Sequence, residues 1–299
     1  MLKTNEMSVS TQKILIVTII AFIIMAFLGT FITASLMIAG DIDLVNIAPD
    51  TFDLSQRNWF RLGLLANNLL MFGGTALLAF FYLYRANWVS AAGLDQGPTS
   101  GSLGYASGFF LLALPLVAYL AYLNLQVDLP DWAVQNEEQT NKMLQGVLTM
   151  ESVPEFLLAL LTAAVTPAIA EELLLRGLVQ KRLLGGWLKN HHAAIWLAAT
   201  IFSTMHFEFG GFLPRLALGV TLGYAYHWTS SLWVPIILHF LFNGLQVAVA
   251  YFTGEFTPDT EMADVPPWWM ALISFLIISF LWVKAEKSQL GAAAGASIA

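Results

Sequence analysis

The sequence predicts an all-α, polytopic membrane protein, a bundle of about eight transmembrane helices. The first observation is composition: 58% of the 299 residues are apolar and only 11% are charged, whereas a soluble globular domain carries about 25% charged residues. The second is the arrangement of the apolar residues in long runs, most of them near the roughly 20 residues that a spanning helix needs. The third is that the ten tryptophans cluster at the ends of these runs, as aromatic side chains do at membrane interfaces.

The runs predict eight spans. The first is too long for the apolar core of a signal peptide, which is about 7–15 residues. We expect it to remain uncleaved, with a signal anchor trimmed after Ala39 as the alternative. The fifth and sixth runs are short and border polar residues. In order, the expected spans are 14–39, 62–84, 103–125, 153–184, 193–207, 212–228, 232–252 and 268–283.

The fourth run is longer than a bilayer requires. At 1.5 Å per residue, 153–184 extends about 48 Å against a hydrocarbon core of about 30 Å. We therefore expect this helix to tilt or protrude. Pro167 lies near its middle and lacks a backbone N–H, so it is expected to kink the helix.

The distribution of charge predicts the topology. In the eight-span arrangement, most lysines and arginines fall on one side and most carboxylates on the other. Positive residues favour cytoplasmic loops, so both termini are expected in the cytoplasm, and an even number of spans satisfies this. The expected organisation is a cytoplasmic tail (1–13), a transmembrane domain (14–284) with a catalytic core (153–252), and a disordered tail (285–299). The exterior loop 126–150 is expected to hold a short interfacial helix.

Composition also excludes several classes of function. A net charge of −7 gives no indication of nucleic-acid binding. The absence of cysteine rules out disulfides, thiolate metal sites and a cysteine nucleophile. The chain contains no HExxH zinc motif, no GxSG serine turn and no GxGD aspartate motif. The surroundings of Ser107 read Gly104-Tyr105-Ala106-Ser107-Gly108 and do not match the serine turn.

Three groups of polar residues lie at the depth of the membrane. Ionisable side chains at the bilayer centre cost about 2.5–3.5 kcal/mol each even on lenient scales, so they usually face a protein-lined or wet cavity. Glu172 and Arg176 are four residues apart, the spacing of a helical ion pair, while Glu171 points about 100° away. One carboxylate can therefore pair with the arginine while the other faces a site. The three groups are Glu171, Glu172 and Arg176; Phe202 to His206; and His239 to Asn243.

Each group also has a purely structural interpretation. Glu172 and Arg176 can form an ion pair that only joins helices, and a lone histidine in a span often makes an interhelical hydrogen bond. Other polar residues fit simpler roles. We expect His191 and His192 to be solvated, His227 to be interfacial, and Glu208 to face the exterior interface. Asn67 and Asn68 are expected to bond between helices, and Gly219 and Gly223 to allow close helix packing.

The three groups together resemble the CPBP family, the CAAX prenyl protease and bacteriocin-processing (Abi, Rce1-like) intramembrane proteases. The motifs of that family, EExxxR, FxxxH and HxxxN, occur here in order at Glu171–Arg176, Phe202–His206 and His239–Asn243 without a departure. The resemblance covers about 153–252. It implies hydrolysis of a peptide bond by a water activated between Glu171 and His206.

The resemblance also implies roles for the other residues. His239 and Asn243 would donate to the oxyanion, a contribution of about 3–4 kcal/mol per donor, and Arg176 would orient Glu172. A competing mechanism places a metal, zinc being the candidate, on His206, His239 and Glu171, a set that suits a catalytic zinc with an open position. Both mechanisms remain open, and the metal-free one is preferred narrowly.

Three functions follow as hypotheses. The first is an intramembrane endopeptidase. The second is a catalytically silent scaffold or immunity protein that binds another membrane protein. The third is a proton-coupled transporter with Glu171 and Glu172 as a relay, which the lack of a visible inverted repeat disfavours. The expected partners are the lipid bilayer and a membrane-associated peptide or protein substrate, with lipidation of that substrate left open. The expected location is a bacterial inner membrane, crossed several times.

Overall fold

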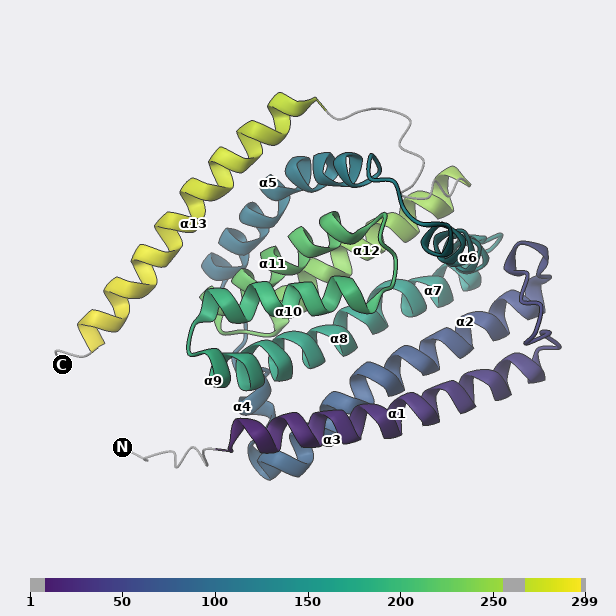
Figure 1. Ribbon diagram of the computed structural model, residues 1–299, viewed down its shortest axis with the longest axis horizontal. Coiled ribbons are helices and arrows are strands. Elements are labelled where there is room, and N and C mark those ends of the chain that lie inside the picture. Colours follow the sequence, from purple (N-terminus) through teal and green to yellow (C-terminus); the bar gives the residue numbers. More distant parts are fainter. Residues whose placement is uncertain (1–8, 255–266, 297–299) are drawn as a thin grey trace.

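The computed structural model describes residues 9–254 and 267–296 (Figure 1), and over these residues the ordered elements are all helical. Within these described residues, six helices are long and apolar enough to cross a membrane. The predicted fold class, an all-α polytopic membrane protein, is therefore confirmed. The six helices are α1 (Thr11–Ala39), Leu54–Ala92, α5 (Ser100–Asn124), Val153–Leu188, α12 (Trp233–Thr253) and Trp268–Ser288 of α13 (Trp268–Ala296).

The fifth and sixth predicted spans form helices as well, but neither is among these six. They are α10 (His191–Met205) and α11 (Phe212–Thr229). At 1.5 Å per residue α10 is about 22 Å long, shorter than a hydrocarbon core of about 30 Å. The two helices follow each other directly and pack together in the middle of the bundle (Figure 1).

Side-chain caps define where several helices begin. Ser10 caps α1 by accepting a hydrogen bond from the Lys13 N–H. Asp53 and Gln56 form a reciprocal capping box at α2 (Leu54–Asn68), and Thr99 and Ser102 do the same at α5. Each cap satisfies backbone N–H groups that the first turn leaves without partners. Beyond α2, the same helix continues through a π-helical segment (Leu69–Gly74), α3 (Thr75–Tyr84) and a short 3₁₀ turn (Arg85–Asn87) to α4 (Trp88–Ala92).

The long fourth helix is continuous but not uniform. It consists of α7 (Val153–Leu160), a π-helical segment (Leu161–Val165), α8 (Thr166–Glu172), a second π-helical segment (Leu173–Leu184) and α9 (Gly185–Leu188). Pro167 lies in the first turn of α8, directly after the first π-helical segment. π-Helical turns change the direction of the following side chains and occur frequently at functional sites. The two glutamates of α8 lie between the two π-helical segments.

Residues 126–150 contain α6 (Asp131–Leu148), where the sequence predicts a short helix. Figure 1 shows α6 almost end-on, while the spanning helices run across the view. The predicted disordered tail needs correction, because α13 continues to Ala296. The segment beyond Lys287 is rich in alanine, the strongest helix former. Residues 1–8 and 297–299 of the predicted tails lie outside the described residues.

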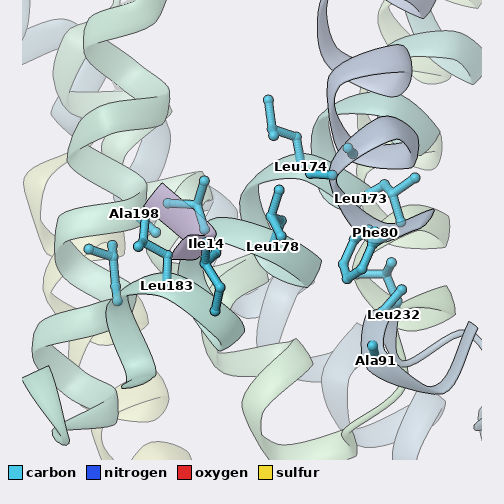
Figure 2. Close-up of a cluster of buried hydrophobic side chains, with 14 of the residues drawn as sticks. Ile14, Phe80, Ala91, Leu173, Leu174, Leu178, Leu183, Ala198 and Leu232 are labelled. Carbon is cyan, nitrogen blue, oxygen red and sulfur yellow. The ribbon is translucent and has the colours of Figure 1, made fainter. Parts of the chain in front are cut away.

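The hydrophobic core that positions the candidate site is built from helices distant in the sequence. Figure 2 shows Ile14 of α1, Phe80 of α3, Leu178 of the second π-helical segment and Leu232 beside α12 in one buried cluster. Close helix packing around it depends on small residues. At Gly219 an added Cβ atom would lie 3.0 Å from the Cβ of Ala199, so α11 and α10 pack as the glycine spacing predicts.

Candidate active site

Four of the predicted site residues line one cavity of about 450 Å³. Glu171 reaches it from α8, His206 from the C-terminal end of α10, and His239 and Asn243 from α12. The rest of the wall is mostly apolar and includes Phe110, Leu218 and Phe242. A largely apolar cavity with a few convergent polar groups is the usual form of a small-molecule or peptide site.

Glu172 and Arg176 form the ion pair that their spacing predicts. The distance from Arg176 Nη1 to Glu172 Oε1 is 3.1 Å, and both side chains are almost fully buried. Arg176 also donates from Nη2 to the Gly219 carbonyl (3.1 Å). The same Glu172 oxygen lies 2.9 Å from His239 Nδ1. Glu172 therefore connects the arginine of its own helix to the histidine of α12, while Glu171 faces the cavity.

His206 is held through one ring nitrogen. Its Nδ1 lies 2.8 Å from the Phe202 carbonyl, so an Nδ1–H donor leaves Nε2 as the acceptor. His206 is at the C-cap of α10, where the helix ends, and the next residue, Phe207, has a positive φ of 55°. The side chain is exposed at the wall of the cavity. The arrangement provides a fixed hydrogen-bond acceptor that solvent can reach.

Asn243 compensates for the proline of the fourth helix. Pro167 has no N–H to donate to the carbonyl four residues earlier, that of Ala163. Asn243 donates from Nδ2 to this carbonyl at 3.1 Å. A backbone group left free by a proline in a membrane helix is commonly satisfied in this way by a neighbouring helix. One amide hydrogen of Asn243 is thus used, and the second remains for the cavity.

Asn68 is a site residue whose specific role sequence reasoning did not identify. It was expected to bond between helices, and it donates from Nδ2 of α2 to Glu171 Oε1 at 3.0 Å. The only sequence signal was a polar pair, Asn67 and Asn68, inside an apolar run. This bond orients the Glu171 carboxylate from the opposite wall of the cavity.

The loop after His206 is anchored to two other helices. Asn136 of α6 donates to the Phe207 carbonyl at 2.7 Å, and the carboxylate of Glu137 accepts the Gly210 N–H. Asn124 of α5 donates to the Phe209 carbonyl at 2.8 Å. Glu208, expected to face the exterior interface, forms an ion pair with Arg215, which lines the cavity. These contacts connect the position of His206 to α6.

The metal-binding alternative involves three of the same residues, Glu171, His206 and His239. Their ligand atoms are not all within 4.8 Å of one another, and among the described residues only His191, His227 and Glu286 meet that criterion. In addition, Glu171 Oε1 accepts from Asn68 and His239 Nδ1 faces Glu172. As arranged, the three side chains do not form a common ligand set for a metal ion.

Two further polar clusters were not found by sequence reasoning. The first is Glu155 of α7 with Arg57 and Arg61 of α2, at distances of 3.0 and 2.9 Å from Glu155 Oε1. The second contains His191, His192 and His227. The two neighbouring histidines were expected to be solvated, and their side chains are 40% and 39% exposed. His191 contacts Glu286 (3.2 Å) and His192 contacts the Tyr224 hydroxyl (2.7 Å). In both clusters the contacting residues lie far apart in the sequence, so their spacing did not predict the contacts.

Fold and site together define a polytopic helical membrane protein with a buried carboxylate–arginine–histidine cluster beside a cavity. Residues 153–245 match the family of type II CAAX prenyl endopeptidase Rce1-like proteins. This segment is an Rce1-like domain and includes the helices that carry all six predicted site residues, so the predicted resemblance is confirmed. The family that this segment matches is one of endopeptidases.

A curated relative is uncharacterized protein YpbD of Bacillus subtilis (strain 168), which is 29% identical over 103 residues. The alignment covers 33% of this chain and 47% of YpbD, so the chain matches about half the length of that relative. No solved structure matches the chain.

Proposed function

We propose that the protein is an intramembrane endopeptidase that hydrolyses a peptide bond with a water activated by Glu171 and His206. One observation carries this proposal: Glu171, His206, His239 and Asn243, from three helices, line the same cavity. Four polar side chains at membrane depth are costly unless they serve a purpose. The match to the Rce1-like family at residues 153–245 supports the same class of reaction.

Glu171 acts as the general base. A carboxylate in a partly dry pocket is a competent base near neutral pH. It removes a proton from a water that also donates to Nε2 of His206, and the resulting hydroxide attacks the carbonyl carbon of the peptide bond. When the C–N bond breaks, the proton held by Glu171 passes to the leaving amine. The hydroxyl group of the water remains on the new carboxyl terminus, so the step is balanced without a further reactant.

His239 and Asn243 stabilise the oxyanion. Asn243 offers the amide hydrogen that the Ala163 carbonyl does not occupy. His239 donates its Nδ1–H to Glu172, so its Nε2 also carries a hydrogen to donate when the ring is an imidazolium. The adjacent carboxylate stabilises the positive charge of that ring. Arg176 fixes Glu172 in place. Each oxyanion donor is expected to contribute about 3–4 kcal/mol to the transition state.

The substrate is a membrane-associated peptide or protein that places an extended segment against the apolar wall of the cavity. Leu64, Met71 and Phe72 form one part of that wall, and Phe110, Leu218 and Phe242 another. A lipid-modified substrate fits this environment equally well. In the membrane, the basic helix ends face the cytoplasm.

The test uses the purified full-length protein in liposomes. Two probes are added separately, a farnesylated peptide ending in a CaaX sequence and an unmodified transmembrane peptide, and the products are identified by mass spectrometry. Wild-type protein is expected to cleave at least one probe. Glu171→Gln and His206→Gln are expected to slow cleavage by about 10²–10⁴-fold, the usual contribution of acid–base groups.

The matched control is Thr200→Ala on α10, because Thr200 is exposed and its hydroxyl donates to the Trp196 carbonyl of its own helix. It is expected to cleave at the wild-type rate. Cleavage by Glu171→Gln at that rate would rule out the proposed base. A scaffold or immunity function would instead appear as full complementation of a cellular phenotype by Glu171→Gln.

A further inference from the structure

A second cluster of ionisable side chains lies at the junction of three helices. His191 begins α10, His227 lies in the last turn of α11, and Glu286 belongs to α13. One ligand atom from each residue lies within 4.8 Å of the other two. His191 Nε2 is 3.2 Å from Glu286 Oε2, and His192 Nε2 is 4.0 Å from the same oxygen. Three imidazoles thus surround one carboxylate.

Neighbouring residues orient these groups from behind. Trp228 donates from Nε1 to Glu286 Oε1 at 2.8 Å, which leaves Oε2 directed at the histidines. The Tyr224 hydroxyl lies 2.7 Å from His192 Nδ1, which leaves Nε2 of that ring directed at Glu286. Hydrogen bonds of this kind, to the far side of each ligand, are typical of metal sites and fix the direction of the ligand atoms.

The separation of His191 and Glu286 suits a small divalent cation. With bonds of 2.0–2.2 Å, the nitrogen and oxygen ligands of tetrahedral zinc are separated by about 3.3–3.6 Å. The 3.2 Å between His191 Nε2 and Glu286 Oε2 is close to that separation. A cavity of about 180 Å³ lies against His191 and His227, so two of the three ligand side chains border open space.

We propose that His191, His227 and Glu286 bind a transition-metal ion of the zinc class, with His192 in reach as a fourth ligand. This site is separate from the candidate active site. His191 and His206 lie at opposite ends of α10, and 15 helical steps of 1.5 Å place them about 22 Å apart.

The ion would attach α13 to the rest of the bundle. α13 lies at the edge of the fold, against α5 and along one side only (Figure 1). Only 11% of the apolar 18-residue stretch of this helix is buried, the lowest share among the six candidate spans. A metal shared by α10, α11 and α13 would hold this peripheral helix in place. Binding to the folded state alone stabilises it by mass action.

The test measures metal binding directly and does not depend on proteolytic activity. Full-length protein carrying an affinity tag without histidine is purified in detergent, stripped with EDTA and titrated with Zn²⁺ by calorimetry. Co²⁺ serves as a second probe, because its visible absorption reports tetrahedral coordination. Wild-type protein is expected to bind about one Zn²⁺ per chain. His191→Ala, His227→Ala and Glu286→Gln are each expected to weaken binding at least tenfold.

His206→Ala is the matched control, since it removes a histidine from the candidate active site. It is expected to bind Zn²⁺ at this second site with wild-type affinity. Zn²⁺ should raise the melting temperature of the wild type and of His206→Ala. It should not raise the melting temperature of the cluster variants, which are compared where their metal-free melting temperature equals that of the wild type. No Zn²⁺ binding by the wild type, binding unaffected by the three cluster substitutions, or binding lost in His206→Ala would each overturn the proposal.

Discussion

Glu172 is the residue on which the candidate site is organised, because a single oxygen atom lies near both Arg176 and His239. Arg176 and His239 are both buried. Replacing the Glu172 carboxylate therefore leaves a buried Arg176 without a counter-ion. Glu172→Gln is therefore expected to lower the free energy of unfolding by about 3–5 kcal/mol, the usual cost of breaking a buried ion pair. Unfolding in mixed micelles with increasing denaturing detergent measures this change.

A double substitution separates the structural role from the catalytic one. Replacing a whole buried pair by apolar residues of similar volume is often neutral or stabilising. Glu172→Leu combined with Arg176→Met is therefore expected to recover most of the lost stability while peptide cleavage stays absent. Recovery of cleavage along with stability would show that the pair only supports the fold.

Asn68 provides a second prediction for single residues. It holds the Glu171 carboxylate through one hydrogen bond of 3.0 Å. In the proposed mechanism Asn68→Ala misorients the base without removing it, so kcat is expected to fall about tenfold or more while KM changes little. Thr18→Ala, which removes a hydroxyl bonded only within α1, is the control. An effect confined to KM would assign Asn68 to substrate binding instead.

At the scale of elements, the cluster around Glu155 joins α2 to the start of α7 and to the end of α6. Besides the two arginines, Glu155 accepts the Glu151 N–H at 3.0 Å, and Arg61 donates to the Val147 carbonyl at 3.0 Å. Glu155→Gln is expected to destabilise the protein by about 3–5 kcal/mol, because buried Arg61 loses its counter-ion and Arg57 keeps only the exposed Glu151. Unfolding in mixed micelles is again the measurement.

Glu151 offers a matched control for this cluster. It also pairs with Arg57, at 3.1 Å, but its side chain is 71% exposed. Ion pairs in such positions contribute between 0 and about 1 kcal/mol. Glu151→Gln is therefore expected to leave stability almost unchanged. Equal losses from Glu151→Gln and Glu155→Gln would contradict the importance of burial.

Packing between elements is tested at Gly223, where α11 meets the fourth helix and α10. An added Cβ would lie 2.8 Å from Gln180 Oε1 and 2.8 Å from Ile195 Cγ2, in a region where Gln180 also donates to the Gly223 carbonyl. Gly223→Ala is expected to cost about 1–3 kcal/mol of stability, as overpacking does. Gly104→Ala in α5, where nothing lies within 4 Å, is expected to stabilise by up to about 1 kcal/mol.

For the whole molecule, the helices and their order followed from the sequence because apolar runs and interfacial tryptophans mark spans directly. The Glu172–Arg176 contact followed from helical spacing alone. The partner of Glu172 on α12, the Asn68 bond to Glu171 and the bond between Asn243 and Ala163 depend on how distant helices pack, and spacing along one chain does not encode that. The cluster of His191, His227 and Glu286 was missed for the same reason.

The orientation of the whole bundle is the remaining expectation from charge. The start of α1, the α3–α4 junction, α9 and the end of α13 lie at one end of the bundle in Figure 1, and α6 lies at the other. Lys13, Arg85, Lys189 and Lys287 lie on those helix ends. Because basic residues favour the cytoplasmic side, that end is expected to face the cytoplasm, with α6 outside.

The absence of native cysteine makes this orientation directly measurable. Gly97→Cys is placed at the basic end, where nothing lies within 4 Å, and Gln139→Cys on the exposed face of α6. A maleimide that cannot cross membranes is expected to label Gln139→Cys in intact cells, and Gly97→Cys only after permeabilisation. The opposite pattern would invert the topology. It would also move His206 and its loop, which α6 anchors through Asn136 and Glu137, to the cytoplasmic side, from which substrates would then have to enter.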